Sequence, residues 1–470
     1  MSKEKSEAKK LQEKLFDKKK HLGLIMSDEE IKESFDFCEG YKKFLDNAKT
    51  ERAAVKTAVE MAEKRGFTEY KRDEKLKAGD KIYFVNRGKA VILAIIGTES
   101  VEKGLRVTAA HIDSPRIDLK QNPLYEENEL ALFKTHYYGG IKKYQWTAVP
   151  LALHGVMIKK DGEILNINIG EDDNEPVFCI SDLLPHLAAE QYKRHLGDGI
   201  KGEELNVIVG SMPFRDDEIS DKVKLGIMSL LNEKYGITEA DFTSAELELV
   251  PAHKARDIGF DRSMVGSYGQ DDRVCAYVSL KALLDCKKEK VKKTSMVVLA
   301  DKEETGSDGN TGLKSAYLRY FIYDIAAALG ADGRDVISNS ECLSADVNAA
   351  FDPTFPDVLD KRNAAYLNKG VCVTKFTGSR GKSGTSDASA EFMGRIRVLL
   401  DKNKVIWQTG ELGKVDLGGG GTVAAYLANL NMDVIDIGVP VLSMHSPLEI
   451  TAKTDIYMTY KAVQAFIKDS

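Results

Sequence analysis

The chain has 470 residues, of which 43% are hydrophobic, and this length is sufficient for two or three domains with a large buried core. Its 67 basic and 73 acidic residues give a formal net charge of −6, which provides no general attraction to nucleic acid or to anionic membranes. The sequence contains no apolar stretch of transmembrane length and its first ten residues lack the apolar core of a signal peptide, so we expect a cytoplasmic protein with neither a membrane nor a nucleic acid as partner.

The first predicted elements are a helix and a hairpin. Ser27 and Glu30 form a capping-box pattern, which predicts that an amphipathic helix begins here. Residues 81–85 and 90–96 are rich in apolar residues on either side of a turn that contains glycine, and this pattern predicts two paired strands.

A histidine follows the next predicted strand. The apolar run 106–110 predicts a buried strand that leads directly into His111, two residues before Asp113. On an extended chain both side chains lie on the same face, so Asp113 could hold one imidazole nitrogen and leave the other free for a metal ion. A structural histidine beside a turn aspartate explains the pattern equally well.

The pattern of predicted elements changes between residues 120 and 252, where strands predominate. Strands are predicted over 148–158 and 163–169, aromatic and glycine residues gather at 137–140, and a helix is expected near His186. We therefore predict an inserted, β-rich domain. The predicted division is 1–119 and 253–470 for the two parts of a catalytic domain and 120–252 for the inserted domain.

After residue 257 strands and helices alternate to the end of the chain. This alternation predicts α/β/α layers around a mostly parallel sheet, in which ligands gather beyond the carboxyl ends of the strands. Acidic residues and a histidine occupy such positions. They are Asp271 before the helical run 274–284, Glu303 and Glu304 after the strand-like run 296–300, Asp346, and His445 after the strand-like run 434–442.

Glu303 and Glu304 are adjacent carboxylates at the end of a predicted strand. One member of such a pair can bind a cation while the other takes a proton from metal-bound water, although most Glu-Glu pairs are solvated surface charge. Imidazole and carboxylate donors without a thiolate suit two zinc, cobalt or manganese ions, with Asp271 between them. The candidate ligands are His111, Asp271, Glu304, Asp346 and His445, and Glu303 is the candidate general base.

Five short segments, taken in chain order, resemble the binuclear-metal motifs of the aspartyl aminopeptidase family. They are residues 109–115, 271–273, 303–307, 344–346 and 443–446. The resemblance extends from about residue 31 to residue 456, and the run 413–422 is similar to the bacterial branch. It implies a three-layer zinc-exopeptidase-like catalytic domain with an inserted dimerisation domain. It also implies a zinc-dependent enzyme that removes the N-terminal residue of peptides with a free N-terminus, and a tetrahedral dodecamer built from dimers.

The same resemblance adds residue roles. It assigns the five ligands and the base as above, and it implies that His186 reaches the neighbouring subunit's site and that Lys369 contacts the substrate. A structural histidine on an amphipathic helix and a surface lysine before a turn are simpler interpretations of these two residues. In the glycine-rich run 418–421, Gly419 and Gly420 suit either a phosphate or a closely approaching peptide backbone, and the resemblance favours the peptide.

Asp352 marks a departure from the family pattern. Eukaryotic members carry a histidine and an aromatic cluster in this region, and an aspartate there would repel an acidic side chain. We therefore expect neutral or basic N-terminal residues to be accepted instead of a strict acidic preference. Two alternatives stay open, namely a deacylase or carboxypeptidase on the same binuclear scaffold and a non-catalytic, shell-forming oligomer.

Overall fold

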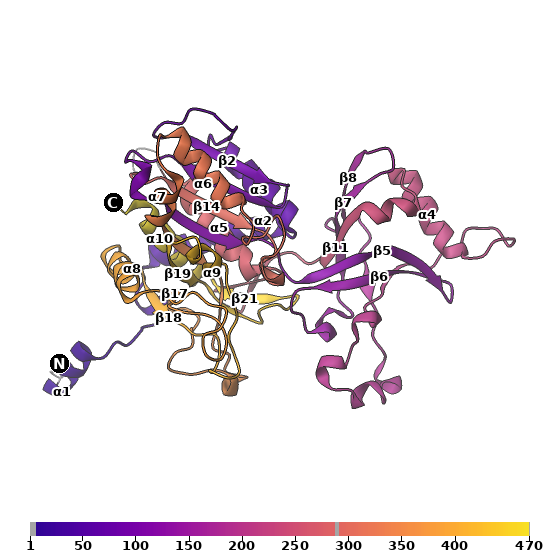
Figure 1. Cartoon of the computed structure of the whole chain (residues 1–470). Helices are drawn as coiled ribbons and strands as arrows, with labels where there is room; N and C mark the ends of the chain where they lie inside the picture. The colour runs from indigo at the N-terminus through magenta and orange to yellow at the C-terminus, as the bar shows by residue number, and fades with distance from the viewer. Residues whose placement is uncertain (1–5, 287–290, 470) are drawn as a thin grey trace.

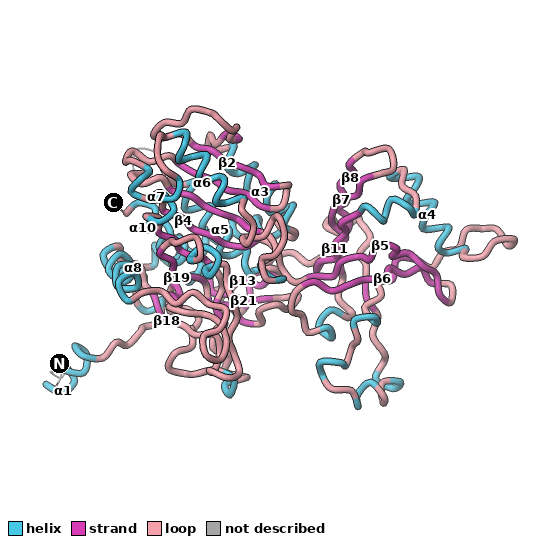
Figure 2. The backbone as a smooth tube through the Cα atoms, in the orientation of Figure 1, coloured by secondary structure: helices cyan, strands magenta, loops and turns pink. Residues whose placement is uncertain are grey.

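The computed structural model describes residues 6–286 and 291–469, which form two lobes connected by extended strands (Figure 1 and Figure 2). Each lobe is built on its own sheet, a mixed one in the first lobe and an antiparallel one in the second. The helix α1 (Glu7–Leu15) projects from the first lobe into solvent. Within the described residues, every helix is too short or too polar to cross a bilayer.

The first lobe contains a nine-stranded sheet. Its central, mutually parallel strands are β14 (Ser295–Ala300), β4 (Arg106–His111), β15 (Glu341–Ala345) and β19 (Asp433–Gly438). The outer strands are β1 (Thr68–Glu69), β2 (Lys81–Asn86) and β3 (Ala90–Ile95) on one side and β17 (Val371–Thr374) and β18 (Trp407–Thr409) on the other. The predicted hairpin is confirmed. The sheet is mixed: most of its pairings are parallel, as predicted, but β3 pairs antiparallel with β2 and β14, and β17 pairs antiparallel with β19.

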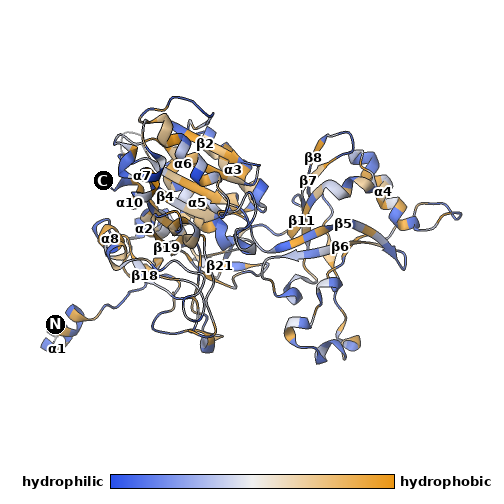
Figure 3. Cartoon of the chain, viewed as in Figure 1, coloured by the Kyte–Doolittle hydropathy of each residue, from blue (hydrophilic) through white to orange (hydrophobic). Residues whose placement is uncertain are grey.

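Helices cover both faces of this sheet. One face packs against α2 (Asp28–Asn47), α3 (Glu51–Glu63), α5 (Gln270–Leu284), α8 (Ala390–Lys402) and α10 (Lys453–Lys468). The other packs against α6 (Tyr317–Ala328), α7 (Gly333–Ser338) and α9 (Ala424–Ala428). Because β3 and β14 are buried on both faces, their sequences are nearly continuous apolar runs, and Figure 3 shows orange strands in the interior of the first lobe.

The start of α2 agrees with its predicted capping box. The Ser27 hydroxyl accepts a hydrogen bond from the Glu30 backbone N–H, and the Glu30 carboxylate accepts one from the Ser27 N–H. Two of the N–H groups that have no partner within the helix are thereby satisfied, so the helix begins where the sequence predicts.

The second lobe contains a seven-stranded sheet in which every pairing is antiparallel. Its strands, in spatial order, are β8 (Ile164–Ile169), β7 (Leu151–Ile158), β11 (Ala245–Pro251), β5 (Arg116–Glu127), β6 (Leu130–Tyr138), β10 (Val207–Gly210) and β9 (Cys179–Ile180). The helix α4 (Lys222–Tyr235) packs against it, with Val223 in a core that also includes Trp146. The strands β5 and β11 connect this lobe to the first.

The helix expected near His186 is absent, and this prediction is wrong. Only a short 3-10 turn, Pro185–Leu187, is present there. Leu184 is extended, as the residue before a proline usually is, so no helix can enter this turn from the N-terminal side. The leucines that suggested an amphipathic helix are therefore exposed and do not form a buried stripe.

A third, five-stranded sheet lies beside the carboxyl edge of the central strands. Its strands are β12 (Arg256–Ile258), β13 (Met264–Ser267), β21 (Glu449–Ala452), β20 (Pro440–Leu442) and β16 (Asn348–Ala349). The run predicted as one strand over 434–442 is divided between β19 and β20, which belong to different sheets. The chain thus leaves the central sheet after Gly438 and reaches His445 within a few residues.

Candidate metal centre

The central strands bring the predicted ligands together at their carboxyl edge. His111 is the last residue of β4, and Asp346 directly follows β15. The glutamate pair follows β14 in a short 3-10 turn, Glu303–Thr305. The remaining two ligands come from other elements, Asp271 from the irregular start of α5 and His445 from the loop after β20.

The Asp271 carboxylate lies between two imidazole rings. Its Oδ1 is 3.1 Å from Nε2 of His111, and its Oδ2 is 3.1 Å from Nε2 of His445. The backbone of Asp271 is also fixed, because its N–H donates to Glu449 Oε2 at 3.0 Å and its carbonyl accepts from Ser114 Oγ at 2.6 Å. A carboxylate whose two oxygens face different imidazoles has the arrangement of a ligand that bridges two cations.

The other carboxylates complete two overlapping groups of donors. Nε2 of His111 lies 3.8 Å from Asp346 Oδ1, and Nε2 of His445 lies 3.4 Å from Glu304 Oε2. In the part of the chain that the structure describes, ligand atoms within 4.8 Å of one another form two sets, neither of which includes His445. These sets are His111, Asp272 and Asp346, and His111, Asp271 and Glu304.

Asp113 organises one side of the centre. Nδ1 of His111 lies 3.0 Å from the Asp113 carbonyl oxygen and 3.4 Å from its Oδ1. The same carboxylate accepts the backbone N–H groups of Glu303 at 3.1 Å and Glu304 at 3.2 Å. Burial would raise the pKa of Asp113, but its hydrogen bond with His111 lowers it. One carboxylate therefore orients both an imidazole and the glutamate pair.

Several carboxyl groups of the centre hold their protons unusually strongly. Burial raises the pKa of Glu303 to about 7, and burial together with the nearby Asp271 raises that of Glu304 well above its usual value. Burial and the nearby Asp272 likewise raise the pKa of Asp346. Burial opposes protonation of His445, yet its contact with Asp271 raises its pKa to about 10. The centre thus concentrates more negative charge than its two imidazoles can balance.

Unpartnered oxygens show that a divalent cation fits this site. Among the described residues, Glu304 Oε1 and Asp272 Oδ1 are buried and have no hydrogen-bond partner. A buried carboxylate oxygen without a partner is costly, and a divalent cation would stabilise it. Imidazoles and carboxylates without a thiolate are also the donors found in catalytic zinc sites.

Sequence reasoning missed two acidic residues of the centre. Asp272 stands at the start of α5, where favourable charge at the helix N-terminus would be a sufficient explanation, but it is fully buried and its Oδ2 accepts from the His111 N–H at 3.3 Å. Glu449 accepts the N–H groups of both Asp271 and His445, the latter at 2.7 Å. Burial raises the pKa of Glu449 to about 8. The only available signal was a glutamate at the start of a short apolar strand, which by itself indicates no site.

The other four predicted site residues have different surroundings. His186 is exposed on its 3-10 turn, and the Lys369 ammonium donates to the carbonyl of Lys19 at 3.1 Å. A Cβ on Gly419 would lie 1.9 Å from the carbonyl oxygen of Gly378, whose N–H donates to Gly420. The close backbone approach in this glycine-rich run is thus to another loop of the same chain.

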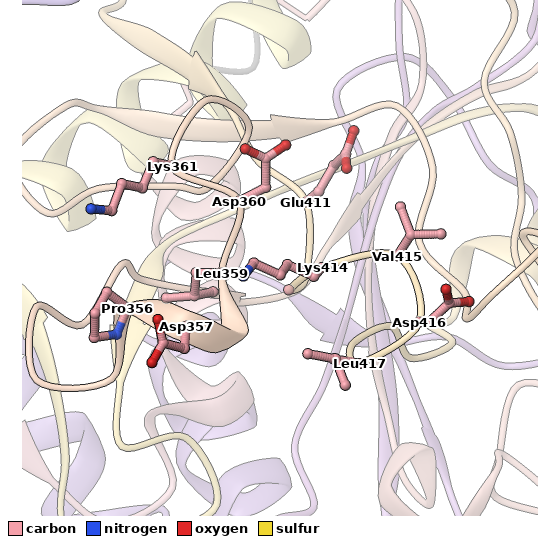
Figure 4. Close-up of a pocket in the computed structure, with 11 residues that line it drawn as sticks. Pro356, Asp357, Leu359, Asp360, Lys361, Glu411, Lys414, Val415, Asp416 and Leu417 are labelled. Carbon is pink, nitrogen blue, oxygen red and sulfur yellow. The ribbon is translucent and has the colours of Figure 1, made fainter.

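A hollow of about 720 Å³ opens beside His445. Its wall includes Gly140, Asp352 and Phe355 together with residues 441–446. A separate hollow of about 690 Å³ is lined by carboxylates and lysines of residues 356–361 and 411–417, and it includes none of the predicted ligands (Figure 4). Of these two hollows, only the one beside His445 adjoins a predicted ligand.

Comparisons with known proteins identify the family of this chain. The family described as "Aminopeptidase I zinc metalloprotease (M18)" matches residues 44–467. A protein of Clostridium acetobutylicum named "Probable M18 family aminopeptidase 1" is 53% identical over 450 residues, which cover 94% of this chain and 96% of the relative. The crystal structure of an M18 family aminopeptidase from Thermotoga maritima is 44% identical, with a TM-score of 0.92 over 96% of this chain and 99% of that one. A structure of the mApe1 dodecamer from S. cerevisiae, 23% identical with a TM-score of 0.75 over 92% of this chain and 97% of that one, shares the fold.

Proposed function

The chain belongs to the M18 family and is a zinc metalloaminopeptidase, and we propose that the metal centre described above is its active site. There it would remove N-terminal residues from peptides in the cytoplasm. We propose that each chain binds two divalent metal ions. Zinc is the proposed native metal, and cobalt or manganese could occupy the same sites. Their proposed ligands are His111, Asp271, Glu304, Asp346 and His445. The observation that carries this proposal is the Asp271 carboxylate, with one oxygen 3.1 Å from each of two imidazoles.

Bound divalent ions would lower the pKa of water and polarise a peptide carbonyl. Glu303 is the proposed general base. Its Oε2 lies 3.9 Å from His111 Nε2, and burial raises its pKa to about 7, so the carboxyl group can accept and return a proton near neutral pH. Glu303 would take the proton of the attacking water and deliver it to the leaving amine.

The second lobe is the proposed site of subunit contact. We propose residues 1–119 and 253–470 as a three-layer zinc-exopeptidase-like catalytic domain and 120–252 as an inserted dimerisation domain. The exposed side chains of Leu183, Leu184 and Leu187 support this assignment, since apolar groups gathered on a surface favour contact with another chain. His186 lies among them, and we propose that it helps stabilise the oxyanion in a neighbouring subunit. A dodecamer built from dimers is the proposed assembly, supported by the yeast relative solved as a dodecamer.

Substrate selectivity is proposed to depend on the hollow beside His445. Asp352 is part of its wall, and a carboxylate there disfavours an acidic N-terminal residue. We therefore propose neutral and basic N-terminal residues as preferred. The substrate contacts of Lys369, Gly419 and Gly420 stay predictions.

Zinc content and product analysis together test the proposed function. His445→Ala and Asp346→Ala should each bind less zinc than the wild type and lose activity. The control is His21→Ala, a change of an exposed histidine that is not a proposed ligand, and this variant should match the wild type in zinc content and activity. A peptide with a free amine should lose its first residue, and its N-acetylated copy should resist hydrolysis. Hydrolysis of the acetylated peptide would favour the deacylase or carboxypeptidase alternative, and a function that survives zinc removal would favour the non-catalytic oligomer.

A further inference from the structure

Three consecutive residues of the second lobe lie against the metal centre of the first. Tyr138 is the last residue of β6, and Gly139 and Gly140 follow it. The sequence singles out this segment by its aromatic and glycine residues, but none of the roles assigned above uses it. Each of the three residues contacts a different part of the proposed ligand shell.

Tyr138 contacts the carboxylate that orients one half of the centre. Its hydroxyl donates to Asp113 Oδ2 at 2.7 Å. Asp113 in turn accepts the backbone N–H groups of Glu303 and Glu304 and faces the His111 ring. The hydroxyl of Tyr138 therefore fixes a carboxylate on which the positions of an imidazole and of the glutamate pair depend.

Gly140 contacts the other half. Its carbonyl oxygen lies 2.8 Å from Nδ1 of His445, so it accepts the proton of that nitrogen and leaves Nε2 facing Asp271. Gly139, between them, has a φ of +71°, and a Cβ at this position would lie 3.4 Å from the Glu304 Cβ and 3.3 Å from Pro115 Cγ. A glycine allows the segment to turn this close to the ligands.

Charged groups at the junction of the lobes hold the Tyr138 ring. The Arg116 guanidinium lies 3.9 Å from the ring centroid. Arg116 is also paired with Glu248 of β11 at 3.2 Å and with Glu51 of α3 at 3.5 Å, so it contacts both lobes. The ring is thus anchored to the junction itself and not to the second lobe alone.

We propose that residues 138–140 are a positioning element through which the second lobe sets the geometry of the metal centre. Tyr138 acts through Asp113 on the His111 side, and Gly140 acts on the His445 side. This inference rests on the ligand set proposed above. It means that zinc affinity depends on how the second lobe lies on the first, although the second lobe supplies no proposed ligand to its own centre.

Tyr138→Phe tests the proposal, because it removes one hydroxyl and keeps the ring. The matched control is Tyr137→Phe, a change of the neighbouring, exposed tyrosine. Zinc affinity of the full chain is measured by competition with a chelator. We expect Tyr138→Phe to weaken zinc binding about 10-fold to 100-fold, the usual effect of removing a group that orients a ligand, and Tyr137→Phe to leave it unchanged. In excess zinc, kcat of Tyr138→Phe should recover while KM stays near that of the wild type.

Two further measurements distinguish a positioning role from a general loss of stability. The thermal midpoints of the zinc-free variants should match each other, which excludes destabilisation of the fold as the cause. Gly139→Ala, which places a Cβ on a residue with a φ of +71° and 3.3 Å from Pro115 Cγ, should weaken zinc binding as well. Wild-type zinc affinity in Tyr138→Phe overturns the positioning role. If the wild type itself binds no zinc, or His445→Ala binds zinc as the wild type does, the proposed function fails instead.

Discussion

Glu303 and Glu304 are neighbours in the sequence with different surroundings in the structure. The side chain of Glu304 is 4% exposed and faces His445, whereas that of Glu303 is 17% exposed and faces His111. The 3-10 turn directs the two side chains apart while Asp113 holds both backbone N–H groups. This difference supports a ligand role for the more buried residue and a proton-transfer role for the one that water can reach.

Replacing Glu303 by Gln should separate catalysis from metal binding. Because the amide cannot accept a proton, we expect kcat to fall about 10²-fold to 10⁴-fold with zinc content unchanged. Glu233→Gln, an exposed change on α4, is the control and should keep wild-type kinetics. Steady-state rates and zinc content on the same preparations check the prediction, and a near-native kcat in Glu303→Gln would remove Glu303 as the base.

The sequence predicts those residues of the site that directly follow an apolar strand. His111, Glu304 and His445 follow such runs, so their common location can be inferred from the rule for carboxyl edges. Glu449 and Tyr138 could not be inferred this way, because each acts through hydrogen bonds to residues remote in sequence. The contact from Asp271 to Glu449, for example, spans 178 positions.

The chain segments where β15 and β19 leave the central sheet position two proposed ligands of the centre. Where β19 ends, Gly438 packs so closely on β15 that a Cβ would lie 1.6 Å from the carbonyl oxygen of Asp346. Only glycine allows this approach. The contact fixes the backbone of Asp346 directly, and because Gly438 begins the connection to β20, it also influences the position of the loop that carries His445. The strand-like pattern of residues 434–442 does not show this approach, because Gly438 and Asp346 are far apart in the sequence.

Gly438→Ala should therefore damage both stability and metal binding. The added methyl must displace backbone, and we expect a loss of at least about 1–3 kcal/mol in the free energy of unfolding with a lower zinc content. Gly394→Ala is the control, since it lies in α8 with open space around it and should be neutral or stabilising. Urea unfolding with zinc analysis checks both variants. Wild-type zinc content in Gly438→Ala would show that the approach does not position Asp346.

At the scale of elements, the sequence predicts strands and caps better than it predicts their pairing. The buried runs of β4 and β14 and the capping box of α2 depend on local patterns, which is why they are correct. The direction of β17 against β19 depends on where the intervening chain returns to the sheet, and no local pattern records this. The short turn at His186 likewise follows from a single proline in a segment whose leucines have no core to enter.

The two lobes meet through buried ion pairs as well as through strands. Glu171, which follows β8, accepts from Lys49 at 2.9 Å and lies 2.9 Å from His154 Nε2. Burial would raise the pKa of Glu171, but these contacts lower it to about 2. Burial also lowers the pKa of Lys49, which shows that placing its ammonium group at the junction costs free energy. Part of the stabilisation from the Lys49–Glu171 ion pair offsets this cost.

The ion pair between Glu171 and Lys49 should make the free energy of unfolding depend on pH in the acidic range. A carboxyl group whose pKa is lower in the folded state stabilises the protein fully above its unfolded value of 4.5, and this contribution is lost as the pH falls toward about 2. Glu171→Gln should therefore lower the free energy of unfolding by about 3 kcal/mol at pH 7, and its difference from the wild type should shrink between these two pH values.

Unfolding followed across pH compares Glu171→Gln with Glu163→Gln, whose exposed carboxylate pairs with Lys159 and should contribute little to stability. A difference between Glu171→Gln and the wild type that does not change with pH would show that the Glu171 contacts are not ionic.

The proposed mechanism depends on two cations that share the carboxylate of Asp271. The most direct measurement is anomalous diffraction at the zinc edge from crystals of the zinc-loaded protein. We predict two peaks per chain, one on the His111 side and one on the His445 side of Asp271. A single peak, or peaks remote from these side chains, would contradict the account.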